Sequence, residues 1–79
     1  MTDYFIDITN ELCPMTFVKT KLAIERMQSG QIIEIRLRGV EPLRNVPRSL
    51  RDYGQVILSL TAEPGEGEHG IHRLTVRKT

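Results

Sequence analysis

The sequence has one cysteine, no tryptophan, and only two tyrosines and two phenylalanines among its 79 residues. A single cysteine, Cys13, cannot form an internal disulfide, which excludes the disulfide-stapled class of small secreted domains. We therefore expect a reducing, cytoplasmic compartment. The shortage of aromatic rings argues against a surface that stacks on single-stranded nucleic acid, because such recognition depends on exposed rings.

Long apolar runs and a strong charge excess are also missing. No apolar run approaches the length that spans a bilayer, and the first ten residues carry Asp3 and no basic segment before an apolar run. We expect neither a secretory signal nor a membrane partner. The formal net charge of +1 lacks the basic balance of a dedicated nucleic-acid binder, so direct nucleic-acid binding is not expected.

The chain instead has the composition of one ordinary domain, residues 1–79, with 39% hydrophobic and 27% charged residues. Glycine and proline separate short elements, which we predict as strands over 4–8, 32–39, 55–62 and 71–78 and helices over 14–28 and 45–54. The order β-α-β-α-β-β predicts an α/β two-layer sandwich. Its four-stranded mixed sheet carries both helices on one face.

Helical periodicity assigns a core side and a solvent side to each predicted helix. On the first helix the core side is Phe17, Thr20, Ile24 and Met27. A second apolar stripe lies among the charged residues and begins beside Cys13; it consists of Met15, Val18 and Leu22. The second helix is predicted to start with Asn45 as cap and Pro47 in its first turn. Its inward side is Leu43, Val46, Leu50 and Tyr53, and its outward side is Arg44, Arg48 and Arg51.

Cys13 stands directly before Pro14, a favoured first residue of a helix. Unpaired backbone N–H groups and the helix dipole at such a position lower the pKa of a thiol and make it nucleophilic. The alternative is that Cys13 packs as a small buried hydrophobe.

His69 falls in the predicted hairpin tip and His72 in the last strand, far from Cys13 in the sequence. This spacing favours neither a protease-like dyad nor a zinc site, so we expect no metal and no cofactor. His72 is interpreted as a strand residue, exposed or with its hydrogen bonds satisfied, and His69 as a solvated loop residue.

The segments LCPMT, MQSG, LRNVP and DYG together resemble the TusA/SirA-type sulfurtransferases over nearly the whole chain. That family has a Cys-Pro-x-Pro motif, a basic residue eight positions after the cysteine, a glycine that ends the helix and an Asp-Ile-Pro-like segment. The matching residues here are Cys13, Pro14, Lys21, Gly30 and Asn45-Val46-Pro47.

The resemblance implies a sulfur carrier whose Cys13 takes sulfane sulfur as a persulfide from a donor protein, such as a cysteine desulfurase or a rhodanese, and passes it to an acceptor protein. Family members serve tRNA thiolation, molybdenum-cofactor metabolism or sulfur oxidation, and we expect a monomer or weak dimer. The sequence departs from the family at Thr16, which replaces the second proline, and at Gly39-Val40, where many members have Asp-Pro.

Pro14, Met15 and Thr16 are the predicted supports of the site. Thr16 restores an N–H donor that proline lacks and adds a hydroxyl, from which we predict a thiolate at least as well stabilised. The predicted partner-binding residues lie near Cys13 in the sequence or on the basic side of the second helix: Met15, Val18, Lys19, Lys21, Leu22, Arg44 and Arg48. The arginines of this side, together with Arg51, Arg36 and Arg38, could steer an acidic partner or contact RNA; the alternative is that they only form a solvated face.

A second hypothesis is a non-catalytic module that binds RNA or a regulatory protein, with a structural or redox-sensing Cys13. We place Phe17 and Tyr53 in the core, which leaves few rings for RNA. Cys13→Ser separates the two hypotheses, because it removes sulfur transfer and leaves such binding intact.

Overall fold

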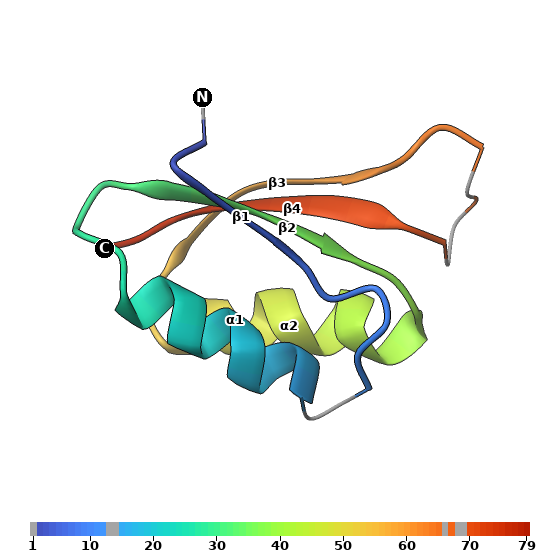
Figure 1. The fold of residues 1–79 in the computed structure, drawn as a ribbon, viewed down its shortest axis with the longest axis horizontal. Helices are drawn as coiled ribbons and strands as arrows, with labels where there is room; N and C mark the ends of the chain where they lie inside the picture. The colour runs from blue at the N-terminus through green and yellow to red at the C-terminus, as the bar shows by residue number, and fades with distance from the viewer. Residues whose placement is uncertain (1, 13–14, 66, 68–69) are drawn as a thin grey trace.

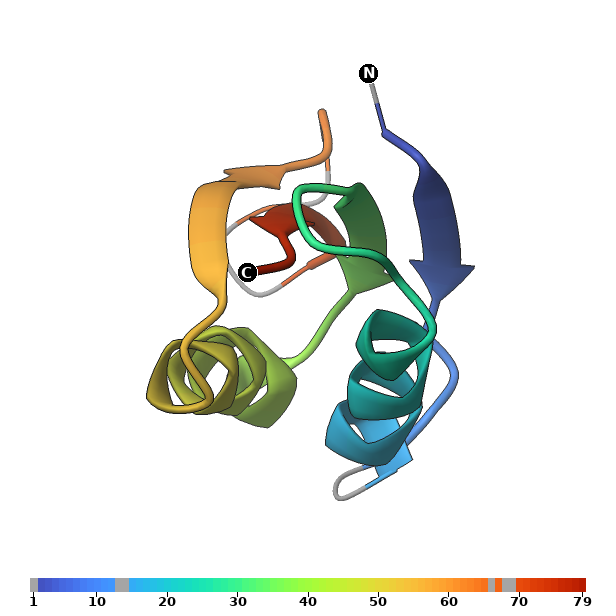
Figure 2. The same ribbon diagram turned by 90° about the vertical axis from the view of Figure 1, so that its left-hand side faces the viewer.

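A four-stranded sheet forms one layer and two helices form the other in the computed structural model, which describes residues 2–12, 15–65, 67 and 70–79 (Figures 1 and 2). The element order is β1 (Tyr4–Asp7), α1 (Met15–Glu25), β2 (Ile32–Leu37), α2 (Val40–Asp52), β3 (Val56–Ala62) and β4 (His72–Arg77). Both helices cover the same face of the sheet. The predicted β-α-β-α-β-β sandwich is therefore confirmed, although the strands and α1 are shorter at their ends than predicted.

The sheet is mixed, with the strand order β1-β2-β4-β3. β1 pairs with β2 in parallel, from Tyr4 opposite Ile33 to Asp7 opposite Arg36, while β4 is antiparallel to both of its neighbours. Since β1 and β2 run in the same direction, their carboxyl ends meet at one edge of the sheet. The connections into α1 and α2 leave from that edge.

The core lies between the sheet and the helices. In β2 the alternation of the sequence is confirmed, because Ile33, Ile35 and Leu37 are fully buried. They pack with residues of β4, of both helices and of the segment after β1: Leu74, Val76, Ile24, Met27, Val46, Leu50 and Ile8. Burying an aliphatic side chain of this kind contributes roughly 1.5–3 kcal/mol.

α1 buries two threonines beside Ile24 and leaves three of its apolar residues exposed. Thr16 and Thr20 are fully buried, and the Thr20 hydroxyl donates to the Thr16 carbonyl oxygen over 2.8 Å, which satisfies a polar group inside the core. Met15, Val18 and Leu22 are exposed, as their stripe predicts. We call these three residues the apolar face of α1.

The start of α2 is a correction. The helix begins at Val40, so Asn45 is an exposed residue within it and not its cap, and Pro47 lies inside the helix. Pro42 occupies the first turn, where its missing N–H costs nothing, whereas Pro47 removes one backbone hydrogen bond and buries its ring. The true start was present in the sequence as Gly39 followed by Pro42.

Tyr53 is also a correction, because it is 60% exposed and not part of the core. It stands just beyond α2, where the helical positions that predicted its burial no longer apply. Its ring stacks on partly buried Phe17, with ring centroids 5.8 Å apart, and the Lys21 ammonium lies 5.2 Å from its centroid. The ring therefore lines a small pocket together with Phe17 and Lys21 of α1 and Leu50 of α2.

The face of the sheet away from the helices carries a network of ion pairs. Arg36 pairs with Asp7 at 3.0 Å and with Glu63 at 2.7 Å, and Arg73 pairs with Glu63 at 3.0 Å and with Glu34 at 2.6 Å. These contacts raise the pKa of both guanidinium groups, chiefly through the hydrogen bonds that each donates to Glu63, and lower the pKa of Glu63, chiefly through the hydrogen bonds from Arg36. Arg36 therefore does not extend the arginine side of α2, as the sequence suggested, but stabilises the opposite face.

We predict that Asp7→Asn reduces the acid sensitivity of the fold. Thr9 donates to the Asp7 carboxylate from its hydroxyl at 2.7 Å and from its N–H at 2.9 Å, and Arg36 adds a third bond, which lowers the pKa of Asp7 from 3.8 to about 2. A depressed pKa contributes stability above the ordinary pKa and loses it as pH falls toward the folded value. The difference in unfolding free energy between wild type and Asp7→Asn should shrink between about pH 5 and about pH 2.

Urea unfolding across this pH range measures that difference, and Thr9→Val, which removes only the hydroxyl donor, should give a smaller effect. A difference that stays constant with pH contradicts the assignment.

Candidate functional site

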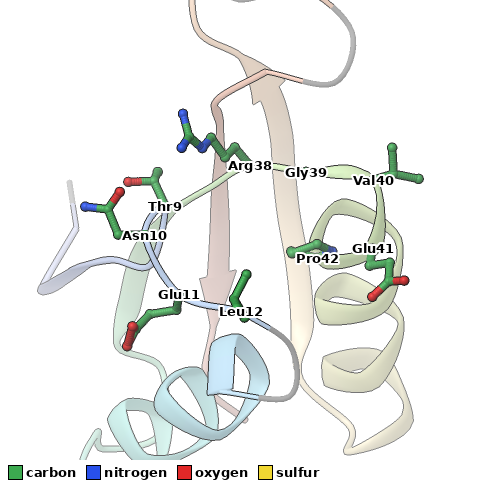
Figure 3. A pocket seen from close by; sticks show the side chains of 9 residues that line it. All are labelled: Thr9, Asn10, Glu11, Leu12, Arg38, Gly39, Val40, Glu41 and Pro42. Atoms are coloured by element: carbon green, nitrogen blue, oxygen red, sulfur yellow. The ribbon is translucent and has the colours of Figure 1, made fainter.

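An open pocket lies at the edge of the sheet where β1 and β2 end (Figure 3). It has a volume of about 470 Å³, and two connections line it: Thr9, Asn10, Glu11 and Leu12 between β1 and α1, and Arg38, Gly39, Val40, Glu41 and Pro42 at the start of α2. The carboxyl edge of neighbouring parallel strands is where α/β sheets commonly bind ligands.

The wall that follows β1 is held in place by short-range bonds. Ile8 donates its N–H to the Arg36 carbonyl at 2.8 Å, and the Ile8 carbonyl accepts from the Glu11 N–H at 3.1 Å. Glu11 forms an ion pair with Lys19 of α1. The connection is thereby fixed both to β2 and to the helix that follows it.

The opposite wall depends on Gly39. Its φ of 101° and ψ of 152° fall in a region that only glycine adopts readily, and its carbonyl accepts from the Leu43 N–H at 3.1 Å. No side chain caps this end of α2. The charges beside it, Arg38 and Glu41, form no ion pair within the described ranges.

The predicted nucleophile Cys13 and its neighbour Pro14 lie outside the described residues. Leu12, which precedes Cys13 in the chain, lines the pocket and is 82% exposed. After the two undescribed residues, the Thr16 N–H donates to the Leu12 carbonyl at 3.3 Å, which is the spacing of an α-helical hydrogen bond. The donor that Thr16 restores therefore bonds to the carbonyl of the residue that precedes Cys13 in the chain.

The other predicted site residues divide between the two helices. On α1, Met15, Val18 and Leu22 are exposed, Lys19 is paired with Glu11, and Lys21 lies over Tyr53. On α2, Arg44 and Arg48 are exposed.

Sequence reasoning missed two apolar residues at the pocket. They are Leu12 and Val40, the latter 51% exposed. Leu12 could have been noticed as the direct neighbour of Cys13 in the sequence. Val40, in contrast, lines the same pocket as Leu12 only because β1 and β2 pair in parallel.

The described part of the chain gives little support for a metal site or a catalytic histidine. No group of three or more His, Cys, Asp or Glu side chains there could hold a metal ion. His72, as expected, has a satisfied ring nitrogen, with Nδ1 2.9 Å from the Gly70 carbonyl oxygen. His69 lies outside the described residues. No described helix has the length and apolar character needed to cross a membrane.

Comparison with known proteins connects these features to one family. Residues 4–78 match the family described as sulfurtransferase TusA. A protein of Archaeoglobus fulgidus, named as a sulfur carrier, is 41% identical over 66 residues, which cover 84% of this chain and 74% of the relative. YedF of Escherichia coli, also named as a sulfur carrier, is 29% identical over 58 residues, or 73% of this chain and 75% of that protein.

The fold agrees with a solved structure. The crystal structure of a SirA-like protein from Desulfitobacterium hafniense superposes with a TM-score of 0.73 and covers 94% of this chain and 95% of its own. At 17% sequence identity this likeness concerns the fold alone.

We predict that Gly39→Ala destabilises the protein by about 1–3 kcal/mol, because a side chain is strained in this backbone conformation. A Cβ at position 39 would also lie 3.4 Å from Cδ of Pro42. Urea unfolding measures the loss. The adjacent exposed substitution Val40→Ala is the control and should change stability by less than about 0.5 kcal/mol. Equal stability of Gly39→Ala and wild type would show that this backbone conformation is not needed.

Proposed function

Because the chain belongs to the TusA family of sulfurtransferases, matched over residues 4–78, we propose that it is a sulfur carrier that holds sulfane sulfur as a persulfide on Cys13. The observation that carries the proposal is the position of Cys13 in the chain. It is the only cysteine, and it lies between the pocket residue Leu12 and α1.

The proposed reaction is two transfers of one sulfur atom. The Cys13 thiolate attacks the outer sulfur of a donor persulfide, R–S–SH; the S–S bond of the donor breaks and its electron pair leaves with the donor thiolate. The product is Cys13–S–SH. An acceptor nucleophile then attacks the same outer sulfur, and Cys13 leaves as a thiolate, so the carrier returns unchanged and no external oxidant or reductant is needed.

Both transfers are faster when Cys13 is a stable thiolate, first as attacking group and then as leaving group. The hydrogen bond from the Thr16 N–H to the Leu12 carbonyl ties the start of α1 to the residue that precedes Cys13. At the start of a helix the first N–H groups and the helix dipole favour negative charge. Pro14 and Thr16 are the proposed supports of the nucleophile.

A sulfur carrier must bind a donor protein and an acceptor protein in turn, and the surface around Cys13 suits such transient contacts. Leu12 and the apolar face of α1 (Met15, Val18, Leu22) are exposed to solvent. α1 buries Thr16 and Thr20 in the core, so these apolar side chains are left on the surface. Lys19 and Lys21 lie at the margin of these side chains, in the arrangement of apolar centre and polar rim found in protein interfaces. We propose this surface, extended by Arg44 and Arg48, as the contact with a cysteine desulfurase or rhodanese and with the acceptor.

The first test is intact-protein mass spectrometry of wild type and Cys13→Ser after incubation with inorganic polysulfide, or with a cysteine desulfurase and cysteine. Wild type should gain one sulfur atom that a reductant removes, and Cys13→Ser should gain none, because the proposed persulfide has no other thiol to form on. No gain in wild type from any of these donors would contradict the proposal and favour a binding module with a structural Cys13.

A second prediction concerns Thr16. Thr16→Pro removes the N–H that bonds to Leu12 and places a ring against that carbonyl, so the link between Leu12 and the start of α1 should loosen. We expect a higher pKa of the Cys13 thiol, measured from the pH dependence of alkylation by iodoacetamide. Thr16→Ser keeps the N–H and the hydroxyl and serves as the control. An unchanged or lower pKa in Thr16→Pro would contradict this role.

A further inference from the structure

Three arginines form a row on the solvent side of α2. Arg44, Arg48 and Arg51 are spaced four and three residues apart, so they lie on one side of the helix and extend over about 10 Å of its axis. All three are exposed. We call them the arginine row.

The arginine row differs from Arg36 and Arg73 of the sheet in its partners. On the open face of the sheet, Arg36 and Arg73 are fully engaged with Asp7, Glu34 and Glu63. Within the described ranges, no member of the arginine row forms an ion pair, although Glu41 and Asp52 stand one turn from Arg44 and Arg48.

Neighbouring like charges on a helix repel one another. The spacing of the arginine row therefore brings neighbouring guanidinium groups into mutual repulsion, and no ion pair to Glu41 or Asp52 offsets it in the described structure. Lys21, held over Tyr53 beside the end of α2, adds a further cation to the helix layer. A complementary set of carboxylates would relieve this repulsion.

We propose that the arginine row binds an acidic surface on a protein partner, with carboxylates spaced by about one helical turn over about 10 Å. The proposal rests on the proposed function, because it names the chemistry of the donor or acceptor that Cys13 serves. α1 and α2 lie side by side on one face of the sheet, and both begin at the edge that holds the pocket (Figures 1 and 2). A partner on the arginine row thus also reaches the pocket and Leu12.

The charges favour a protein over RNA. Glu41, Asp52 and Glu25 are interspersed with the cations of the helix layer, which suits a specific pattern of charges and repels a continuous phosphate backbone. The one exposed ring of this layer, Tyr53, already contacts Phe17 and Lys21. Phe5 is exposed on the other face, next to Glu34 on the neighbouring strand.

The test is a titration of the ¹⁵N-labelled protein with a helical peptide that carries Glu at positions i, i+4 and i+7, followed by NMR. The same peptide with Gln in place of Glu, and single-stranded polyuridine, are titrated in parallel. The Glu peptide should shift the amide signals of residues 44–51, and its affinity should fall as salt increases. The Gln peptide should bind much more weakly.

Two substitutions that change the net charge by the same amount distinguish an effect of the arginine row from an effect of the overall charge of the protein. Arg48→Glu should weaken binding of the Glu peptide roughly tenfold, whereas Arg77→Glu, at an exposed position on β4, should weaken it less than about twofold. Arg48→Gln should lie between wild type and Arg48→Glu. Spectra of the free variants confirm that each is folded.

The proposal is overturned if Arg48→Glu and Arg77→Glu bind the Glu peptide equally, if the shifted signals lie outside α2, or if polyuridine binds residues 44–51 more tightly than the Glu peptide. Polysulfide loading of Cys13, followed by mass spectrometry, tests the proposed function separately and should be the same in wild type and Arg77→Glu, which lies outside the proposed contact surface. Failure of loading in wild type would contradict the proposed function, whatever the peptide shows.

Discussion

The parallel pairing of β1 with β2 is the constraint on which the site depends. It is fixed at both ends: the Asp3 N–H donates to the Ile32 carbonyl at 2.7 Å, and the Ile8 N–H donates to the Arg36 carbonyl at 2.8 Å. A parallel pair requires a crossover, which α1 supplies, and it puts both strand ends at one edge. The pocket, the approach to Cys13 and the start of α2 are therefore assembled by a single ladder of backbone bonds.

The contacts that stabilise the fold and the surface proposed for partner binding lie on different faces of the molecule. The core between β2, β4 and the helices is aliphatic, and the open face of the sheet is held by Arg36 and Arg73 bridging three carboxylates. α1 differs from the rest of the fold, because it buries the polar residues Thr16 and Thr20 and exposes the apolar residues Met15, Val18 and Leu22. Since the sheet and α2 supply most of the core, α1 can expose apolar side chains without loss of the fold. Such side chains are then available for the transient contacts that the proposed docking of a donor and an acceptor requires.

The features that could be predicted from the sequence are those that depend on the spacing of apolar residues within one strand or one helix. Alternation over 32–39 defined β2 and its buried side chains, and helical periodicity identified the exposed stripe of α1. The start of α2 was missed because Asn45 and Pro47 imitate a helix start, whereas the actual start depends on the backbone of Gly39. Arg36 was misplaced because its partners, Asp7 and Glu63, are distant in sequence. The pocket could not be predicted, since its two walls meet only through the register of β1 and β2.

The sequence departs from the family's motif at Thr16 and at Gly39-Val40, which lie in the two segments that follow β1 and β2. Thr16 donates its N–H to the carbonyl of the pocket residue Leu12, and Gly39-Val40 forms the start of α2 across the pocket. A family-typical aspartate at position 39 would bring a carboxylate to the end of α2 that no side chain caps here, and so would change the charge facing any partner in the pocket. Neither departure alters the strand pairing or the cysteine. Partner choice can therefore diverge at this edge while the fold and the proposed sulfur chemistry of Cys13 stay the same.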